Sequence, residues 1–273
     1  MFQIYIYGIS SFLGINIVSQ LLRRYSKTTI YGSVRPSLNR FKVKNHETLK
    51  QLGAILSYDD PEQYIKSLGN TISTVIYCST DDNTDFLNYV SLKLPTLYIS
   101  SVAVTDVEDG RLKMTPYVQQ KMNMEKIVHA NGGSVIRLGF FIGITENMPA
   151  IFNGLQLKTW FHMYNNMPLD QKSYAVTNVD HLIKNVIEPY LYCAKKNVTI
   201  TYCSNKQYSR QLLKQYMNGV YVNNNEPKYY SEYLSANYHQ EITDKYVFNI
   251  MTNVVRPYMD KHNHKFMEYF AQC

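Results

Sequence analysis

The sequence predicts an α/β fold: a doubly wound parallel sheet with a smaller C-terminal lobe. Short apolar runs rich in β-branched and aromatic residues recur in the first half, and amphipathic segments of helical period lie between most of them. Strands that alternate with helices form a parallel sheet covered on both faces. After Gly143 the alternation becomes less regular and the chain becomes richer in Asn and Tyr. We therefore expect a dinucleotide-binding core over residues 1–145 and a substrate lobe over 146–273, with segments of about 172–204 returning to the core.

The N-terminal part contains six strand candidates. They cover residues 2–8, 28–34, 54–58, 73–79, 96–102 and 134–140. A helix is predicted over 12–25, and another over 46–53 that ends at Gly53. Asp60 and Pro61 are typical of the N-cap and the first position of a further helix. Six strands in about 140 residues match the doubly wound dinucleotide-binding (Rossmann) fold.

The C-terminal lobe contains fewer regular elements. Residues 172–187 are predicted to form a strand that enters a helix, and residues 197–204 a further strand. Residues 207–218 are predicted to be helical and residues 218–238 to form a loop. The tail over 246–270 is predicted to be a helix interrupted by Pro257.

The composition indicates a globular, cytoplasmic protein. Hydrophobic residues make up 45% of the chain, and no apolar run approaches the roughly 20 residues of a membrane span. The first residues lack the basic start and the cleavage site of a secretory signal. The four cysteines have neither metal-ligand nor redox-pair spacing, so we expect reduced thiols, no metal and no membrane partner.

The net charge of +7 has two functional explanations. Nucleic-acid binding is disfavoured, because the Lys and Arg residues are scattered and no nucleic-acid motif is present. We prefer a positive cleft that attracts a polyanionic cofactor and substrate. A basic surface that only keeps the protein soluble is nearly as well supported. We therefore expect a small-molecule substrate and no nucleic-acid partner.

The segment GISSFLG, residues 8–14, lies between the first strand and the first helix. Such a turn presents backbone N–H groups and a helix N-terminus to a pyrophosphate. Gly8 would form the tight turn, Gly14 would allow close packing, and Ser11 stands where the backbone approaches the phosphate. The predicted cofactor-binding residues of the turn are Gly8, Ser10, Ser11, Phe12, Leu13 and Gly14. Ordinary helix-start chemistry is the alternative explanation.

The second strand ends in YGSVRPS, where an acidic residue would bind the ribose hydroxyls of NAD. This segment has no acidic residue, and Arg35 is placed to meet a 2′-phosphate instead. The pattern favours NADP as the cofactor, with NAD as the alternative. A solvated surface arginine is an equally good explanation of Arg35.

Four Tyr residues are followed four positions later by a Lys. The pairs are Tyr89–Lys93, Tyr117–Lys121, Tyr192–Lys196 and Tyr202–Lys206. A Tyr and a Lys one helical turn apart can act as an acid with its cationic helper, or can be two ordinary residues of a helix. The spacing alone does not select one of these pairs.

Five segments together resemble the short-chain dehydrogenase/reductase superfamily. They are GISSFLG, VIYCST, LYISSVAV, YVQQKMNMEKIV and VIRLGFFIG. The similarity is greatest to the extended and atypical branches, which include NAD(P)-dependent sugar-nucleotide epimerases, dehydratases and reductases. In this family a Ser or Thr ends the fifth strand, and the Tyr–Lys pair opens the next helix. The resemblance therefore selects Ser101, Tyr117 and Lys121 as catalytic residues, with Ser101 preferred to Ser100 because it directly precedes VAV.

The resemblance also implies a role for each of these residues. Tyr117 would exchange a proton with the substrate oxygen during hydride transfer. Lys121 would lower the pKa of that phenol and hold the nicotinamide ribose, and Ser101 would orient the substrate oxygen. Further cofactor contacts implied by the resemblance are Cys78, Ser79, Thr80 and the backbone from Leu138 to Phe140.

The leading functional hypothesis is an NADP-dependent oxidoreductase that transfers hydride to a keto group of a nucleotide-linked deoxysugar. A sugar-nucleotide epimerase and a non-catalytic NADP sensor of the same fold are the alternatives, and the Tyr–Lys pair counts against the sensor. Basic residues such as Lys158, Lys172 and Arg210 could neutralise a substrate diphosphate. The loop before Tyr117 is short for the extended branch, and Thr105 stands where that branch often has a Tyr. The substrate and a homodimeric state are therefore left open.

Overall fold

The structure, a computed structural model of the chain, describes residues 2–36, 40–142, 154–168, 172–193, 197–226 and 242–270. It divides into two compact units. Unit 1 comprises Met1–Leu138 and His181–Thr201, and unit 2 comprises Gly139–Asp180 and Tyr202–Cys273. Two predictions fall in part outside the described residues. They concern Gly143, where the alternation is expected to change, and residues 227–238 of the predicted loop.

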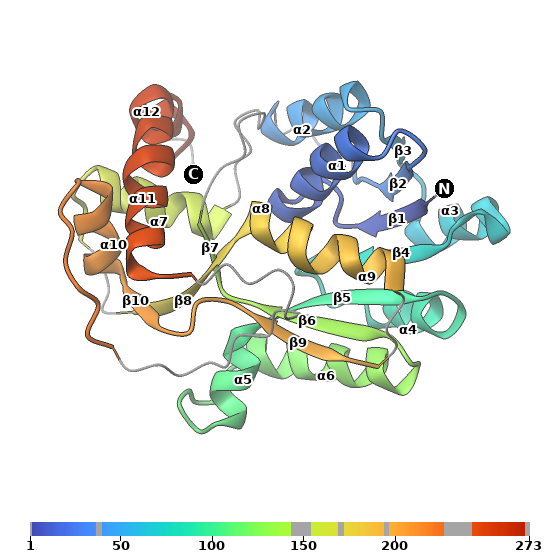
Figure 1. Ribbon diagram of the computed structural model, residues 1–273. Coiled ribbons are helices and arrows are strands. Elements are labelled where there is room, and N and C mark those ends of the chain that lie inside the picture. The colour runs from blue at the N-terminus through green and yellow to red at the C-terminus, as the bar shows by residue number, and fades with distance from the viewer. Residues whose placement is uncertain are drawn as a thin grey trace. The chain divides into compact units, whose positions relative to one another are not determined.

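Unit 1 is built on a seven-stranded sheet (Figure 1). Its strands are β1 (Gln3–Tyr7), β2 (Thr29–Ser33), β3 (Ile55–Ser57), β4 (Thr74–Tyr77), β5 (Thr96–Ser101), β6 (Ser134–Leu138) and β9 (Thr199–Tyr202). The spatial order is β3-β2-β1-β4-β5-β6-β9, and neighbouring strands from β3 to β6 pair in parallel. Because β1 lies between β2 and β4, the chain reverses its winding direction there, and doubly wound sheets bind ligands at this point. The predicted doubly wound sheet is confirmed.

Helices connect the strands of unit 1. They are α1 (Phe12–Arg24), α2 (Arg40–Gln51), α3 (Pro61–Leu68), α4 (Thr84–Lys93), α5 (Val102–Glu108), α6 (Pro116–Ala130) and α9 (Glu188–Cys193). Asp60 caps α3 by accepting from the amides of Glu62 at 3.0 Å and Gln63 at 3.1 Å, as its position predicts. α2 begins at Arg40, earlier than predicted, because the alternating basic and apolar residues at its start have no helical period.

The helices of unit 1 cover both faces of its sheet. On one face, Ile65 of α3, Phe86 of α4 and Met124 of α6 belong to one buried cluster with Tyr77 and Tyr98 of the strands. α1, α2 and α9 lie on the other face (Figure 1). The strands β4, β5 and β6 are buried almost throughout, which is typical of parallel strands between two helical layers.

The single strand predicted over 134–140 is divided at Gly139. β6 ends at Leu138, and β7 (Phe140–Ile142) pairs with β8 (Ser173–Asn178) in the sheet of unit 2. The amide of Gly139 donates to Thr177 Oγ1 at 2.9 Å, and a Cβ at this position would lie 2.3 Å from the carbonyl oxygen of Ala175. Only glycine permits this approach, so one apolar run contributes strands to two sheets.

Unit 2 has its own sheet and its own core. In the order β10-β8-β7, β10 (Gln207–Ser209) is antiparallel to β8, and β7 is parallel to it. Its helices include α7 (Gly154–Tyr164), α10 (Arg210–Met217), α11 (Asp244–Ile250) and α12 (Arg256–Phe270). Trp160, Leu213 and Met251 belong to one buried apolar cluster. Within the described ranges of both units, no helix combines the length and apolar character that crossing a membrane requires.

Among the described residues, two helical segments contain a wide π turn. The strand-to-helix segment predicted over 172–187 is confirmed as β8 followed by α8 (Val179–Leu182), which continues through a π turn over Ile183–Ile187 into α9. In the tail, a π turn over Met251–Val255 precedes Pro257. Proline has no amide hydrogen for the preceding turn, and a π turn accommodates this loss without ending the helix. The interruption therefore lies where the sequence predicts it, as a widened turn.

Candidate active site

The turn between β1 and α1 closes tightly because both of its ends are glycine. Gly8 adopts φ +84°, and a Cβ there would lie 2.8 Å from the backbone nitrogen of Ser79. A Cβ on Gly14 would lie 2.5 Å from the carbonyl oxygen of Gly8. Ser11 caps the helix, and its hydroxyl accepts from the amide of Gly14 at 3.0 Å. The start of α1 can therefore lie directly against the ends of β1 and β4.

The first turn of α1 presents the positive end of a helix. It contains no acidic residue, so no carboxylate of the helix itself competes with a bound anion. The side chains of Phe12 and Leu13 are buried, which leaves only their backbone for a ligand. The carbonyl of Ser10 accepts from the buried Asn45 side chain at 3.4 Å, which ties the turn to α2. This turn fits the pyrophosphate of a dinucleotide.

The residues after β4 lie against the same turn. The Cys78 thiol donates to the carbonyl of Tyr7 at 3.2 Å and lies 3.7 Å from the Ser11 hydroxyl. Burial raises the pKa of this thiol to about 12, so it stays protonated at neutral pH and serves as a packing group. Ser79 is half-buried beside Gly8, and Thr80 is exposed. Of these three residues, Ser79 and Thr80 are the ones accessible from this edge.

A carboxylate that the sequence analysis missed, Asp81, also lies at this edge. Its two oxygens accept from the phenols of Tyr7 at 2.6 Å and Tyr77 at 2.9 Å. Nη2 of Arg35 lies 3.4 Å from Asp81 Oδ2, and the Arg35 side chain is 86% exposed. Asp81 therefore places a carboxylate after β4, beside the arginine that follows β2. The only sequence signal for it is its position directly behind the apolar strand in VIYCSTD.

Ser101 and Tyr117 come together at the carboxyl end of β5. Ser101 ends this strand and caps α5 by accepting from the amide of Ala103 at 3.2 Å. Tyr117 lies in the first turn of α6, two residues after its N-cap Thr115. Burial raises the pKa of the Tyr117 phenol, and a hydrogen bond with the Ser101 hydroxyl partly offsets the rise. The residue keeps 46% of its surface exposed, so a ligand can reach it.

Lys121 lies one helical turn after Tyr117 and is buried, with 3% of its surface exposed. Its Nζ donates to the carbonyl of Ile99 at 3.4 Å. The same atom lies 4.9 Å from the ring centre of Tyr98 and 5.9 Å from that of Tyr117. Burial lowers the pKa of Lys121 to about 8, against the opposing effect of nearby acidic groups. The site therefore contains a cation whose charge changes just above neutral pH.

The two hydroxyls at the end of β5 have different surroundings. The Ser100 hydroxyl is buried and has no hydrogen-bond partner among the described residues. The Ser101 hydroxyl contacts the Ala103 amide and the Tyr117 phenol. Ser101 is therefore the hydroxyl that adjoins the phenol.

The remaining candidate residues are spread over both units. Leu138 ends β6 in register with Ser101 and is buried, so only its backbone could contact a ligand. In unit 2, Arg210 donates to the Tyr174 phenol at 2.5 Å and lies 5.2 Å from the centre of its ring. Lys172 is exposed, and the Lys158 side chain lies outside the described residues.

Three solved structures of enzymes resemble this chain closely in fold. dTDP-glucose 4,6-dehydratase from Bacillus anthracis, in complex with NAD, has a TM-score of 0.73 at 13% identity over 96% of this chain and 98% of that chain. UDP-glucuronic acid 4-epimerase from Bacillus cereus, in complex with UDP-glucuronic acid and NAD, has a TM-score of 0.64 at 16% identity over 94% and 99%. UDP-glucose 4-epimerase from Thermotoga maritima, with UDP-glucose, has a TM-score of 0.60 at 11% identity over 95% and 99%.

The chain has the fold of these enzymes. They are sugar-nucleotide epimerases and a dehydratase, as in the extended branch that the sequence resembles, so that resemblance is confirmed at the level of the fold. No protein-family model and no curated protein sequence matches the chain. At identities of 11% to 16%, the likeness establishes the fold, and the chemistry has to be argued from the side chains of the site.

Proposed function

We propose that the chain is an oxidoreductase that uses a nicotinamide dinucleotide to act on a nucleotide-linked sugar. The observation that carries this proposal is the meeting of Ser101, Tyr117 and Lys121 at the carboxyl end of β5. The β1–α1 turn at the same edge of the sheet fits a pyrophosphate. The solved structures with this fold add support, because one is a sugar-nucleotide dehydratase and two are sugar-nucleotide epimerases.

Tyr117 is proposed to move the proton of the reaction. The bound dinucleotide supplies hydride transfer to or from a substrate carbon. A proton must then be given to, or taken from, the oxygen on that carbon. Burial raises the pKa of the Tyr117 phenol, so the phenol holds this proton at neutral pH. The Ser101 hydroxyl, which partly offsets the rise in the pKa of the phenol, would hold the substrate oxygen beside it.

Lys121 is proposed to stabilise the charge that develops on Tyr117. Its ammonium lies 5.9 Å from the ring centre of Tyr117 and favours the phenolate that remains when the proton leaves. The ammonium would also hold the ribose of the nicotinamide. Because the pKa of Lys121 is about 8, this charge is present at neutral pH and is lost as the pH rises through about 8. We therefore expect turnover to decline on the alkaline side of that value.

The preference for NADP or NAD is proposed to depend on Arg35 and Asp81. Arg35 is exposed just after β2, where it could pair with the 2′-phosphate of NADP, and NADP is the cofactor that we propose from the sequence. The carboxylate of Asp81 lies 3.4 Å from the same guanidinium and would repel a 2′-phosphate. NAD is therefore the alternative cofactor, and it is the dinucleotide bound in the first two enzymes of similar fold.

The reaction is proposed to be reduction of a keto group, with epimerisation as the second candidate. The same three side chains serve hydride transfer in both directions, so they are compatible with either reaction. The two epimerases of similar fold favour the second candidate. A reductase consumes one reduced cofactor for each product, whereas an epimerase returns its cofactor unchanged.

This difference defines the test. The protein is mixed with NADH or NADPH and a panel of nucleotide-linked keto sugars, and loss of the reduced-nicotinamide absorbance is followed. In parallel, nucleotide hexoses are incubated with the protein and a catalytic amount of NAD, and chromatography detects new isomers. We expect conversion in one of the two assays and none with Tyr117→Phe, whose cofactor binding is measured by calorimetry.

Each outcome has a distinct meaning. Cofactor consumption identifies a reductase, and new isomers without consumption identify an epimerase. Cofactor binding with no conversion in either assay would point to a non-catalytic sensor. If neither dinucleotide binds, the proposed function is wrong.

A further inference from the structure

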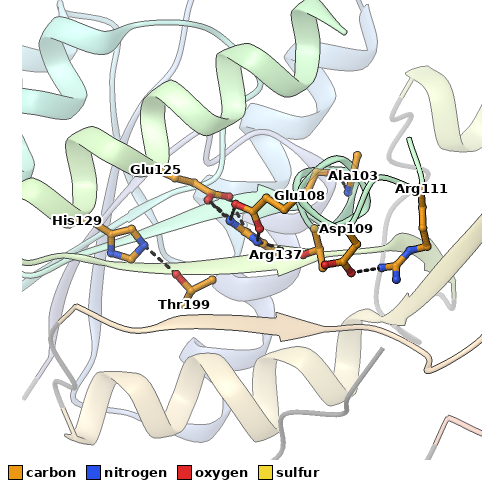
Figure 2. A network of polar contacts seen from close by, with 10 residues as sticks. Ala103, Glu108, Asp109, Arg111, Glu125, His129, Arg137 and Thr199 are labelled. Atoms are coloured by element: carbon orange, nitrogen blue, oxygen red, sulfur yellow. Dashed lines mark hydrogen bonds and ion pairs between the residues drawn. The ribbon is translucent and has the colours of Figure 1, made fainter. Parts of the chain in front are cut away.

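A buried arginine on β6 is bonded to two helices of unit 1 (Figure 2). Nε and Nη2 of Arg137 donate to the carboxylate of Glu125 at 3.1 and 2.7 Å. Nη1 and Nη2 donate to the two oxygens of Glu108 at 2.5 and 2.9 Å. Nη1 also donates to the Thr105 hydroxyl at 3.2 Å. Each of the five N–H groups of this guanidinium therefore has an acceptor.

The contacts of Arg137 are largely shielded from solvent. The side chains of Arg137 and Glu125 are 11% and 6% exposed, whereas that of Glu108 is 43% exposed. A buried charge is tolerated only when it is paired, and removal of one partner leaves the other uncompensated. We therefore expect the hydrogen bonds between Arg137 and Glu125 to persist, because breaking them would leave a buried charge unpaired.

The two carboxylates belong to the helices that carry the candidate catalytic residues. Glu125 lies on α6 one turn after Lys121, which itself lies one turn after Tyr117, so the three residues share one face of the helix. Glu108 ends α5, whose N-cap is Ser101. One guanidinium therefore joins the helix that begins at Ser101 to the helix that carries Tyr117.

Glu125 is also an alternative partner for Lys121. The two residues are four positions apart on α6, and the charge of Glu125 already raises the pKa of Lys121 in part. In the structure, the Glu125 carboxylate is bound by Arg137, and the Lys121 ammonium lies over the rings of Tyr98 and Tyr117, 4.9 and 5.9 Å from their centres. Without Arg137, pairing with Glu125 would draw the ammonium away from the phenol.

We propose that Arg137 is a positioning residue: by holding Glu108 and Glu125 it fixes α5 against α6 and keeps the Lys121 ammonium beside Tyr117. Its kinetic consequence rests on the proposed function, whereas its effect on the phenol is measurable without any substrate. The other ionisable groups that influence the pKa of Lys121 are Cys78 and Asp81, both after β4, and neither contacts Arg137 in the described hydrogen bonds.

The test compares Arg137→Met with Arg24→Met. Arg24 ends α1, far along that helix from the phosphate turn, and forms an ion pair with the buried Glu188. Both substitutions remove an arginine from a shielded glutamate, so both are expected to lower the melting temperature. Only Arg137 is bonded to α5 and α6, so only Arg137→Met should affect Tyr117.

The first measurement uses no substrate. 3-Fluorotyrosine is incorporated in place of Tyr117, and its ¹⁹F resonance is titrated with pH in the wild-type background and in both variants. In the wild-type background the resonance should shift as the neighbouring Lys121 ammonium loses its proton at a pH of about 8, and in Arg137→Met this shift should disappear, because the ammonium is drawn to Glu125. In Arg24→Met it should match the wild-type background. Equal titration curves in both variants would overturn the inference.

The second measurement is kinetic. Arg137→Met should lower kcat by roughly a hundredfold, the effect of misplacing a catalytic group by about 1 Å, while KM for the cofactor changes little. Arg137→Lys, which keeps the charge but not the paired geometry, should recover part of kcat. A fall in kcat that merely follows the loss of stability, equally in the Arg24 variant, would contradict positioning.

The test must still decide the inference if the wild type is inactive or if Arg137→Met does not fold. If the wild-type protein turns over no substrate, the proposed function fails, and the ¹⁹F comparison still decides the inference. If Arg137→Met does not fold, Glu108→Gln and Arg137→Lys replace it, since they keep Glu125 paired. A weaker shift of the ¹⁹F resonance near pH 8 in Arg137→Lys, which keeps the charge but loses the bidentate geometry toward the carboxylates, supports the inference, and wild-type titration in both replacements overturns it.

Discussion

The Tyr117–Lys121 pair on α6 and the Tyr89–Lys93 pair on α4 share their spacing and their unit, but their surroundings differ. In both pairs the lysine lies over the tyrosine ring, with Nζ 5.9 Å from the ring centre on α6 and 4.6 Å on α4. Lys93 is exposed to water, whereas Lys121 is buried. Only Tyr117 has a strand-end hydroxyl beside its phenol. Equal spacing thus places each lysine over its tyrosine ring, and the difference in burial makes the two lysines chemically different.

The pair in unit 2 shows a third environment. Nζ of Lys206 lies 3.4 Å from a carboxylate oxygen of Asp244 and donates to the Asn224 carbonyl at 2.7 Å. Its charge is therefore neutralised within the fold. Lys121, in contrast, forms no ion pair with any carboxylate in the described ranges. A cation that is buried without a carboxylate lowers stability, and such groups are found mostly at functional sites. The remaining pair includes Lys196, which lies outside the described residues.

The largest expected effect separates the two phenols in unit 1. Tyr117→Phe should reduce turnover by about 10²–10⁴-fold, the usual contribution of a placed proton donor, and should leave cofactor affinity unchanged. Tyr89→Phe should retain full turnover, because its half-buried ring packs against the apolar cluster of unit 1 and lies outside the candidate site. The measurement is kcat for both variants with the substrate that the conversion assays identify. Equal activity of the two variants would remove the distinction between the pairs.

The next prediction separates the two hydroxyls at the end of β5. Ser101→Ala should lower kcat by about 10²–10³-fold, as expected on loss of one hydrogen bond to the reacting oxygen. Ser100→Ala should keep kcat and should be as stable as the wild type or more stable, because it removes a buried hydroxyl that has no partner among the described residues. Steady-state kinetics and thermal unfolding of both variants test this. If kcat falls in Ser100→Ala and not in Ser101→Ala, the hydroxyl that holds the substrate oxygen is that of Ser100 and the assignment to Ser101 is wrong.

A smaller effect concerns the cofactor. Arg35→Gln should weaken NADPH binding by about tenfold and leave NADH binding almost unchanged, as expected for loss of one exposed charged contact to a phosphate. Asp81→Asn should act in the opposite direction, because the carboxylate beside Arg35 would no longer repel a 2′-phosphate. Calorimetric titration with both dinucleotides measures these affinities. If the ratio of the two affinities is the same in both variants, the 2′-position does not bind at Arg35.

The smallest effect is on stability. Lys121→Met should raise the melting temperature at pH 7 by a few degrees, because it removes a buried amine whose pKa falls from 10.5 to about 8 on folding. Below pH 8 the amine is charged in both states, and the full cost of its burial is present. As pH rises from about 8 toward 10.5, the folded state loses the proton first, so the wild type gains stability relative to the variant.

The matched variant for this last effect is Lys93→Met. Its lysine is exposed, so the melting temperature should change little at pH 7 and at pH 9. Thermal unfolding of all three proteins at both pH values provides the comparison. A Lys121→Met protein that is less stable than the wild type would show that the ammonium is not a source of strain.

Sequence reasoning succeeded where the signal is local. The alternating strands and helices, the Asp60 cap and the interruption before Pro257 all depend on neighbours within a few residues. It failed at Gly139, where one apolar run divides between two sheets, because the contact with Ala175 comes from a distant strand. It also missed the start of α2, whose first residues show no helical period.

The sequence by itself determined the doubly wound sheet, the glycine turn and the order of Ser101, Tyr117 and Lys121, because periodicity and turn chemistry are written in short segments. Only the tertiary structure decided which of the Tyr–Lys pairs has a buried lysine, and which of the two serine hydroxyls at the end of β5 lies beside the phenol. Asp81 meets Arg35 across 46 positions of the chain, and Arg137 meets Glu108 across 29. The burial and the pairing of charges depend on residues that are distant in the sequence, so they cannot be predicted from a short segment.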